Sequence, residues 1–265
     1  MVMAQIFREI LFQEPNSIFI KVMIMMNLII SAILGYSEGF GKQNLEYSKF
    51  WNVNSQEKAK IPSKMGMIIA YTPSLIASLI FFWIFPNSGI RFFMLNFAMT
   101  IHFFKRLLEV LFVHKYSGAM AMNSAITISS SYFIAFSSLI YIQHLTKAST
   151  EPIIDLKYFG FILFLVGIIG NFYHHFLLSK MRKKGESGYK IPKSGLFNLV
   201  ICPHYLFEIV TFLGFSLISQ TLFSFSSTIG TLFYLMGRSY ATRKWYLSKF
   251  EDFPRNVKAL IPFVF

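Results

Sequence analysis

Three stretches of this sequence place ionisable and polar side chains at helical spacing within or beside apolar runs. The first carries its side chains at positions i, i+3, i+4 and i+7, which share one face of an α-helix: His102, Lys105, Arg106 and Glu109. A charged side chain is costly in lipid and therefore faces a cavity or a partner inside a bundle. We expect this face to form the polar wall of a buried site. The alternative is a helix end that leaves the bilayer, with Lys105 and Glu109 as an ordinary i, i+4 pair.

The other two polar faces lie further along the chain. One ends an apolar run at 157 to 178 and continues into a basic loop, and the other opens with "CPHYLFE". A proline at such a start suits a helix that is interrupted where it lines a cavity. Each face alone also has a simpler explanation, namely an arginine that reaches the interface, a tyrosine at headgroup level or a capped helix start. The residues are Asn171, His174, His175 and Arg182 in the first face and His204, Tyr205 and Glu208 in the second.

The basic loop that follows contains "KKGESGYKIPKSG", Lys183 to Gly195. Its cations and glycines suit a phosphate-rich ligand, because ammonium and guanidinium groups act together with exposed backbone N–H groups. Contact with anionic lipid on the cytosolic side is the alternative. That alternative does not explain Tyr189. The basic residues of this region are Lys180, Arg182, Lys183, Lys184, Lys190 and Lys193.

The composition indicates a membrane protein. Of 265 residues, 54% are hydrophobic and 14% charged, and 32 are Phe, which is too apolar for a soluble domain of this size. The net charge of +13 lies in short segments between apolar runs, so the chain offers nucleic acid no continuous basic surface. One cysteine, Cys202, excludes an internal disulfide, and the six histidines lack the paired spacing of a membrane di-iron site, so we expect no metal centre. We expect no cleaved signal peptide.

Seven apolar runs are long enough to cross a bilayer. We therefore predict an all-α, polytopic bundle of seven transmembrane helices that forms one membrane-embedded domain over residues 1–265. Lys and Arg alternate between the connecting segments in a way that puts the C-terminus in the cytosol. The runs cover 17 to 35, 66 to 85, 90 to 113, 120 to 144, 157 to 178, 196 to 214 and 220 to 237.

The order of residues in two long stretches resembles the C-terminal domain of the steroid 5α-reductase family. The stretches are "GESGYKIPKSGLFNLVICPHYLFEIVTFLGF" and "WYLSKFEDFPRNVKALIPFVF", within a family-like portion of about 115–265. A further block, "HFFKRLLEVLFVHKYSG" from His102 to Gly118, is similar to the same superfamily and especially to its trans-2-enoyl-CoA reductase branch. The resemblance implies an enzyme of the endoplasmic reticulum membrane that uses NADPH to reduce a carbon–carbon double bond conjugated to a carbonyl.

The resemblance also implies roles for single residues. His204 stands where the family usually has Asn, and Thr242 where the steroid enzymes often have His. A Gln-Glu pair of the mammalian steroid enzymes is replaced by Ala70 and Tyr71. The donor to the carbonyl oxygen is then Tyr71, Lys105 or Tyr205. The residues that match family positions holding the cofactor are Asn171, Arg182, Tyr189, Lys190, His204, Glu208, Arg238 and Tyr246.

Three functions follow from these patterns. The first, which we predict from the sequence, is 5α-reduction of a 3-oxo-Δ4-steroid, favoured by the match at the end of the chain; the other two are alternatives. The second is reduction of a very-long-chain trans-2-enoyl-CoA, favoured by the His102 to Gly118 block and by "CPHY". The third is a membrane protein that binds a sterol without catalysis. In each case the partners are a small apolar molecule and the lipid bilayer.

Overall fold

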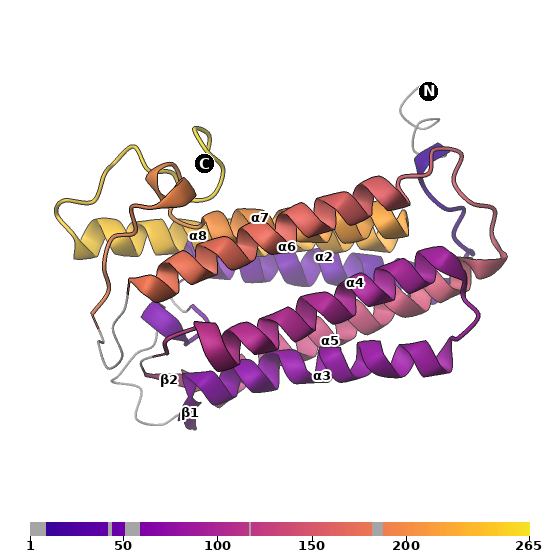
Figure 1. Ribbon diagram of the computed structural model, residues 1–265, viewed down its shortest axis with the longest axis horizontal. Helices are drawn as coiled ribbons and strands as arrows, with labels where there is room; N and C mark the ends of the chain where they lie inside the picture. The colour runs from indigo at the N-terminus through magenta and orange to yellow at the C-terminus, as the bar shows by residue number, and fades with distance from the viewer. Residues whose placement is uncertain (1–8, 42–43, 51–58, 117, 182–187) are drawn as a thin grey trace.

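The computed structural model describes residues 9–41, 44–50, 59–116, 118–181 and 188–265. Long helices dominate this part of the chain (Figure 1). They are α2 (Ile18–Phe40), α3 (Ser63–Ile84), α4 (Gly89–Leu108), α5 (Met122–Leu145), α6 (Lys157–Lys180), α7 (Pro203–Ser219) and α8 (Leu222–Lys249).

Short elements connect these helices. Strand β1 (Lys60–Pro62) pairs antiparallel with β2 (Ala119–Ala121), with Ile61 opposite Met120. A π-helical turn, η2 (Glu109–Val113), continues α4. The 3₁₀ turns are η1 (Ser48–Phe50), η3 (Thr146–Ala148) and η4 (Gly195–Asn198).

Several helices have the length and apolar composition of membrane spans. Among the described residues there are four of these: Ile18–Phe40, Ser63–Ile84, Met122–Ala148 and Lys157–Lys180. Helix α7 is apolar but shorter, and α4 and α8 carry more charge. The prediction of a mostly helical chain with membrane-spanning helices is confirmed, and seven crossings remain a prediction.

The helices lie roughly along one axis (Figure 1). Helices α6, α7, α8 and α2 form one part of the bundle and α3, α4 and α5 the other, and α4 packs against α7. The ends at Phe40, Leu108 and Lys180 therefore lie at the same end of the bundle as the strands β1 and β2 and the C-terminus. We call it the site end. Polar side chains that are far apart in the sequence meet there.

Glycine allows α6 and α7 to approach almost to backbone contact. A Cβ atom added to Gly167 would lie 2.5 Å from the backbone nitrogen of Thr211, and one added to Gly214 would lie 2.6 Å from that of Phe164. Such close approach is typical of helices packed in membranes. Its consequence at the site end is that the Asn171 amide donates a hydrogen bond of 2.8 Å to the backbone oxygen of His204.

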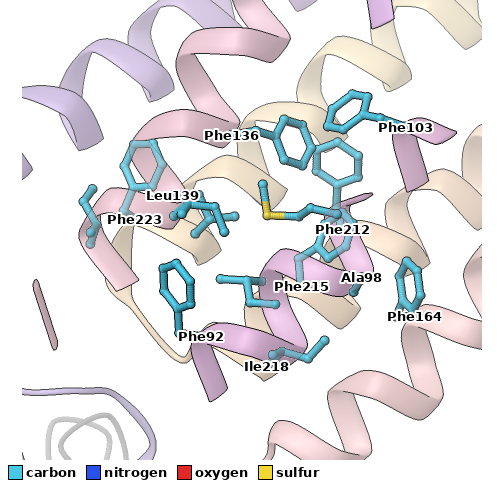
Figure 2. Packing of buried hydrophobic residues seen from close by; sticks show 14 of the residues in the cluster. Phe92, Ala98, Phe103, Phe136, Leu139, Phe164, Phe212, Phe215, Ile218 and Phe223 are labelled. Carbon is cyan, nitrogen blue, oxygen red and sulfur yellow. The ribbon is translucent and has the colours of Figure 1, made fainter. Parts of the chain in front are cut away.

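Below the site end, aromatic rings fill the space between α4, α5 and α7 (Figure 2). Phe103 lies 4.7 Å from Phe136, and Phe136 lies 5.5 Å from Phe212, as measured between ring centroids. The edge-to-face geometry of these pairs is the one that aromatic quadrupoles favour. This rigid cluster holds the polar ends of the three helices in a fixed relation.

Two expected helix bounds are wrong. The run at 196 to 214 becomes helical as α7 only at Pro203, because proline disfavours helical geometry in the residue before it and suits the first helical position. The last run continues beyond residue 237, and α8 ends at Lys249. Arg238, Thr242 and Tyr246 therefore lie on one helical face instead of in a cytosolic tail.

Candidate active site

Glu109 is the centre of a buried charge cluster at the end of α4. Its carboxylate is 1% exposed, and Lys105 Nζ and Arg106 Nη1 each lie 2.8 Å from one of its oxygens. His175 Nδ1, from α6, lies 3.1 Å from Oε1. A buried carboxylate is stable only when its charge is compensated and its lone pairs are bonded. The face predicted from the i, i+3, i+4, i+7 spacing is therefore an inward polar wall.

The π-helical turn adds a residue that the α-helical spacing leaves out. The N–H of His114 donates to the backbone oxygen of Glu109 at 2.8 Å, which is an i to i+5 bond. In an α-helix, residues five apart face different directions, whereas the wider turn brings His114 Nε2 to 4.0 Å from Glu109 Oε2. Burial, and then the neighbouring His175 and Arg106, lower the pKa of His114 to about 2. Turns of this kind are frequent at functional sites.

Tyr71, from α3, is attached to the same cluster. Arg106 Nη2 donates to its hydroxyl oxygen at 2.5 Å, and the guanidinium carbon lies 4.8 Å from the centre of its ring. Tyr132 packs on the Tyr71 ring, and its own hydroxyl donates to Glu208 at 3.3 Å. Arg106 thus fixes the position of the Tyr71 hydroxyl, whose proton can be donated to a carbonyl oxygen.

Asn171 connects this cluster to α7. Its side-chain oxygen accepts from Lys105 Nζ, and its amide nitrogen donates to the backbone oxygen of His204. Lys105 thus bonds both Glu109 and Asn171, and its side chain is 15% exposed. The Lys105 ammonium has three N–H groups, and two of them point to oxygens of Glu109 and Asn171. The third can donate to a substrate.

A cavity of about 210 Å³ opens beside the cluster at the site end. Its walls come from the 47–50 segment, the turn after α4, the end of α6, the 189–192 segment and helices α7 and α8. Residues that line it include Tyr47, Lys49, Phe50, His114, Lys115, Tyr116, Tyr189, Lys190, His204, Tyr205, Arg238 and Tyr246.

Arg238 is the buried cation that α8 contributes to the cavity wall. Its side chain is 2% exposed and lies 2.6 Å from Glu38, a residue of α2 that is 200 positions away in the sequence. The guanidinium carbon lies 4.1 Å from the centre of the Tyr47 ring and 4.2 Å from that of Phe50. Cation–π contacts of this kind add to the ion pair.

The chemistry of the cavity wall fits a dinucleotide phosphate. Lys49, Lys115, Lys190 and Arg238 surround it, and the phenols of Tyr189 and Tyr246 supply polar and aromatic surface. Cations with hydroxyl donors bind phosphates. A dinucleotide needs more room than 210 Å³, so a cavity of this size has room for only part of one.

Glu109, His114 and His175 also resemble a metal triad, because one ligand atom from each lies within 4.8 Å of the other two. Lys105 and Arg106 already bind both oxygens of that carboxylate. A divalent ion would add charge beside two buried cations, and we assign no metal to this cluster.

The structure brings most of the predicted cofactor residues to the cavity. Those that line it are Tyr189, Lys190, His204, Arg238 and Tyr246. Asn171 supports the wall through His204, and Glu208 bonds Tyr132 in the core. Arg182 lies outside the described residues.

The three predicted donors take different positions. Tyr205 lines the cavity, Lys105 lies between Glu109 and Asn171, and Tyr71 is 4% exposed beneath Arg106. The sequence patterns did not predict His114, Glu38 and Tyr47 as site residues. His114 falls within the family-like block from His102 to Gly118, and Glu38, an acid at the end of an apolar run, offered only a weak signal.

Comparison with known sequences connects this geometry to a family. A sequence profile described as 3-oxo-5-alpha-steroid 4-dehydrogenase matches residues 119–265, which is more than half of the chain. The chain belongs to this family. The family resemblance noted from the sequence is confirmed.

Curated relatives fall into two groups. The 3-oxo-5-alpha-steroid 4-dehydrogenase 1 of Mus musculus is 44% identical over 105 residues, 40% of this chain and 41% of the relative. The probable very-long-chain enoyl-CoA reductase of Caenorhabditis elegans is 32% identical over 178 residues, 63% of this chain and 57% of the relative. The very-long-chain enoyl-CoA reductase of Dictyostelium discoideum is 33% identical over 178 residues, with shares of 62% and 55%. The chain thus matches less than two thirds of each relative's length.

The longer matches reach the charge cluster. Residues 119–265 are too few to account for 63% of the chain, so the match to the C. elegans protein extends upstream of Ala119. A continuous match of that length includes every residue from Lys105 to His114.

Proposed function

We propose that this protein reduces a carbon–carbon double bond conjugated to a carbonyl, with NADPH as the hydride donor and a long-chain trans-2-enoyl-CoA as the substrate. The observation that carries the choice of substrate is that the enoyl-CoA reductase relatives match the segment with Lys105, Glu109 and His114. In this segment His114 lines the cavity, and Glu109 lies next to both His114 and Lys105. Relatives of both groups support the reaction class.

NADPH, when bound, supplies the hydride that adds to the β-carbon. The residues of the chain would hold the phosphates of the cofactor, stabilise the charge that forms on the carbonyl oxygen and supply the proton for the α-carbon. Lys190 and Arg238, which line the cavity, would hold the phosphates, and His204 and Tyr205 line the same cavity. As the β-carbon is reduced, the carbonyl oxygen gains negative charge, and a hydrogen-bond donor or cation must stabilise it.

Tyr71 stabilises the carbonyl oxygen, and Lys105 protonates the α-carbon. The Tyr71 hydroxyl, held by Arg106 at 2.5 Å, donates to the carbonyl oxygen. Lys105, fixed by Glu109 and Asn171, gives its proton to the α-carbon. Tyr205 lines the cavity next to His204 and would orient the cofactor there.

Reduction of a 3-oxo-Δ4-steroid is the second candidate. It is favoured by the 44% identity to the Mus musculus protein and by the family profile. A steroid enone has the same conjugated carbonyl, so the same donors would serve it. The proposal also places the protein in the endoplasmic reticulum membrane with the site end in the cytosol, because Lys and Arg gather in the connections at that end.

The test is oxidation of NADPH by purified protein in lipid nanodiscs with either a long-chain trans-2-enoyl-CoA or a 3-oxo-Δ4-steroid. We expect the thioester to be reduced and the steroid to be a poor substrate. Faster turnover of the steroid would establish the second candidate. NADPH binding without turnover of either substrate would indicate a non-catalytic sterol-binding protein.

A cofactor-site variant checks the cavity assignment separately. Tyr189→Ala should weaken NADPH binding at least about tenfold, by roughly 1.4 kcal/mol, because it removes an aromatic hydroxyl from the cavity wall. Tyr158→Ala, an exposed tyrosine at the opposite end of α6, is the matched control and should bind NADPH like the wild type. Equal affinity of both variants would place the cofactor elsewhere.

A further inference from the structure

We propose that His175, with His114 on its cavity side, returns a proton to Lys105 after each turnover, and that Glu109 is the carboxylate through which this proton passes. The inference rests on the proposed reaction, which consumes one proton for each double bond reduced. It assigns a proton-transfer function to Glu109 and to the two histidines beside it, of which His175 is buried and His114 lines the cavity.

The Nδ1 atom of His175 lies between a hydrogen-bond donor and a hydrogen-bond acceptor. It lies 3.0 Å from Arg106 Nη1, a group that always carries hydrogen, and 3.1 Å from Glu109 Oε1, a group that accepts. When the ring proton is on Nε2, Nδ1 accepts from Arg106. When the proton is on Nδ1, it is donated to Glu109. Both tautomers of His175 therefore have a hydrogen-bond partner, and the site does not select one of them.

The adjacent histidine of α6 shows the contrast. His174 Nδ1 lies 2.7 Å from the backbone oxygen of Gly170, which can only accept. Its Nε2 accepts from the backbone N–H of Leu196 at 3.3 Å. His174 is therefore fixed with its proton on Nδ1. The exchangeable tautomer is a property of the His175 position and not of buried histidines in general.

A chain of contacts joins the cavity to the lysine, and its step between the two histidines is an edge-to-face ring contact. His114 lines the cavity, and its ring centroid lies 4.8 Å from that of His175. Glu109 Oε1 contacts His175 at 3.1 Å and Lys105 Nζ at 2.8 Å, so one oxygen touches both. Arg106 holds the other oxygen and keeps the carboxylate from turning away.

Charged and titratable side chains from several elements surround His114 and His175. Lys105, Arg106 and Glu109 come from α4 and its π-helical turn, and His204, 5.3 Å from His175 between ring centroids, comes from α7. Tyr116, 5.6 Å from His114, follows in the next turn. Burial raises the pKa of Tyr116, so its phenol stays protonated.

Protons and electrons balance over one turnover. The β-carbon receives a hydride, which is a proton with two electrons, and the α-carbon receives the proton from Lys105 Nζ. The neutral amine is reprotonated through Glu109: the Nδ1 proton of His175 passes to Oε1 of the ionised carboxylate, and Oε1 passes a proton on to Lys105 Nζ. His175 takes a replacement proton at Nε2 through His114 from water in the cavity, and exchange back to the Nδ1–H tautomer prepares the next cycle. Each cycle consumes one hydride and one proton.

The kinetic test compares His175→Gln and His114→Ala with the control His174→Gln, in the full-length protein and with the substrate that it reduces. We expect kcat to fall about 10²-fold in the first two variants, the scale of a lost acid–base group. KM should be unchanged and the solvent deuterium isotope effect on kcat should increase. Added imidazole should restore part of the activity of His114→Ala, because this residue lines the cavity. Unchanged kcat and isotope effect in both relay variants would overturn the proposal.

Nitrogen NMR of histidine-labelled wild-type protein in detergent gives a readout that does not depend on turnover. We expect His175 to show a shift averaged between its two tautomers and His174 to show one tautomer. A single fixed tautomer of His175 would overturn the relay even if the enzyme is active. An averaged His175 signal without turnover of either substrate would refute the proposed function and still support the exchange of tautomers.

Discussion

Glu109→Gln should be among the most destabilising single changes in this protein, because it removes one charge while keeping the shape of the side chain. The carboxylate is 1% exposed, and Lys105 and Arg106 contact it at 2.8 Å with side chains that are 15% and 11% exposed. At an effective dielectric constant of about 20, each pair at this distance contributes roughly 6 kcal/mol. The desolvation cost of Glu109 offsets part of this sum, and Lys105 can release its proton. A net loss of about 3–5 kcal/mol remains, as for other buried pairs that lose one partner.

The measurement is thermal unfolding in detergent, followed by tryptophan fluorescence. A loss of about 3–5 kcal/mol in a chain of this size lowers Tm by roughly 10 °C. Glu151→Gln is the matched control at the opposite end of the bundle. Glu151 is 57% exposed, and its partner Arg91 keeps Asp155 at 2.7 Å and Gln220 at 2.8 Å. Its loss should cost less than about 1 kcal/mol. If both variants unfold at the same temperature, the charge cluster does not stabilise the fold as argued.

Two further predictions concern packing and pH. Gly167→Leu should lower Tm and weaken NADPH binding, because even its Cβ atom would lie 2.5 Å from Thr211 and push α6 from α7; Gly188→Leu, with no atom within 4 Å, should leave Tm unchanged. His114→Asn should reduce the loss of stability between pH 7.5 and 5.5. The unfolded state gains the His114 proton below about pH 6.5, and the folded state gains it only near pH 2, so stability falls as pH drops in this window, by about 1.4 kcal/mol in total. Parallel pH profiles of Tm for His114→Asn and wild type would contradict the burial of a neutral His114.

The polar wall of α4 was predictable because the geometry of one helix is local. Spacing alone places His102, Lys105, Arg106 and Glu109 on one side, and the cost of charge in lipid turns that side inward. His114 was not predictable in this way. Its place beside Glu109 depends on an i to i+5 turn, and the apolar sequence between them does not distinguish a π-helical turn from a continued α-helix.

The start of α7 shows the limit of hydropathy. Residues 196–202 are apolar enough to extend a span, but Pro203 sets the first helical residue, and the segment before it adopts a 3₁₀ turn and an extended path. The backbone of this segment instead pairs with the end of the chain, because Ile201 donates to the backbone oxygen of Lys258 at 2.9 Å. Sequence patterns report periodicity and do not report such distant partners.

Composition and local spacing are enough to predict that the chain is helical, that several helices are apolar enough for a membrane, and that three helices carry polar faces. These are properties of composition and of repeats three and four residues long. Only the tertiary structure decided which faces meet. Glycine contacts between α6 and α7 align Asn171 with His204, and the closure of the bundle brings Glu38 to Arg238 and His175 to Glu109. The physical reason is that a buried charge is tolerated only beside its partner, and the packing of distant helices determines which partner it finds.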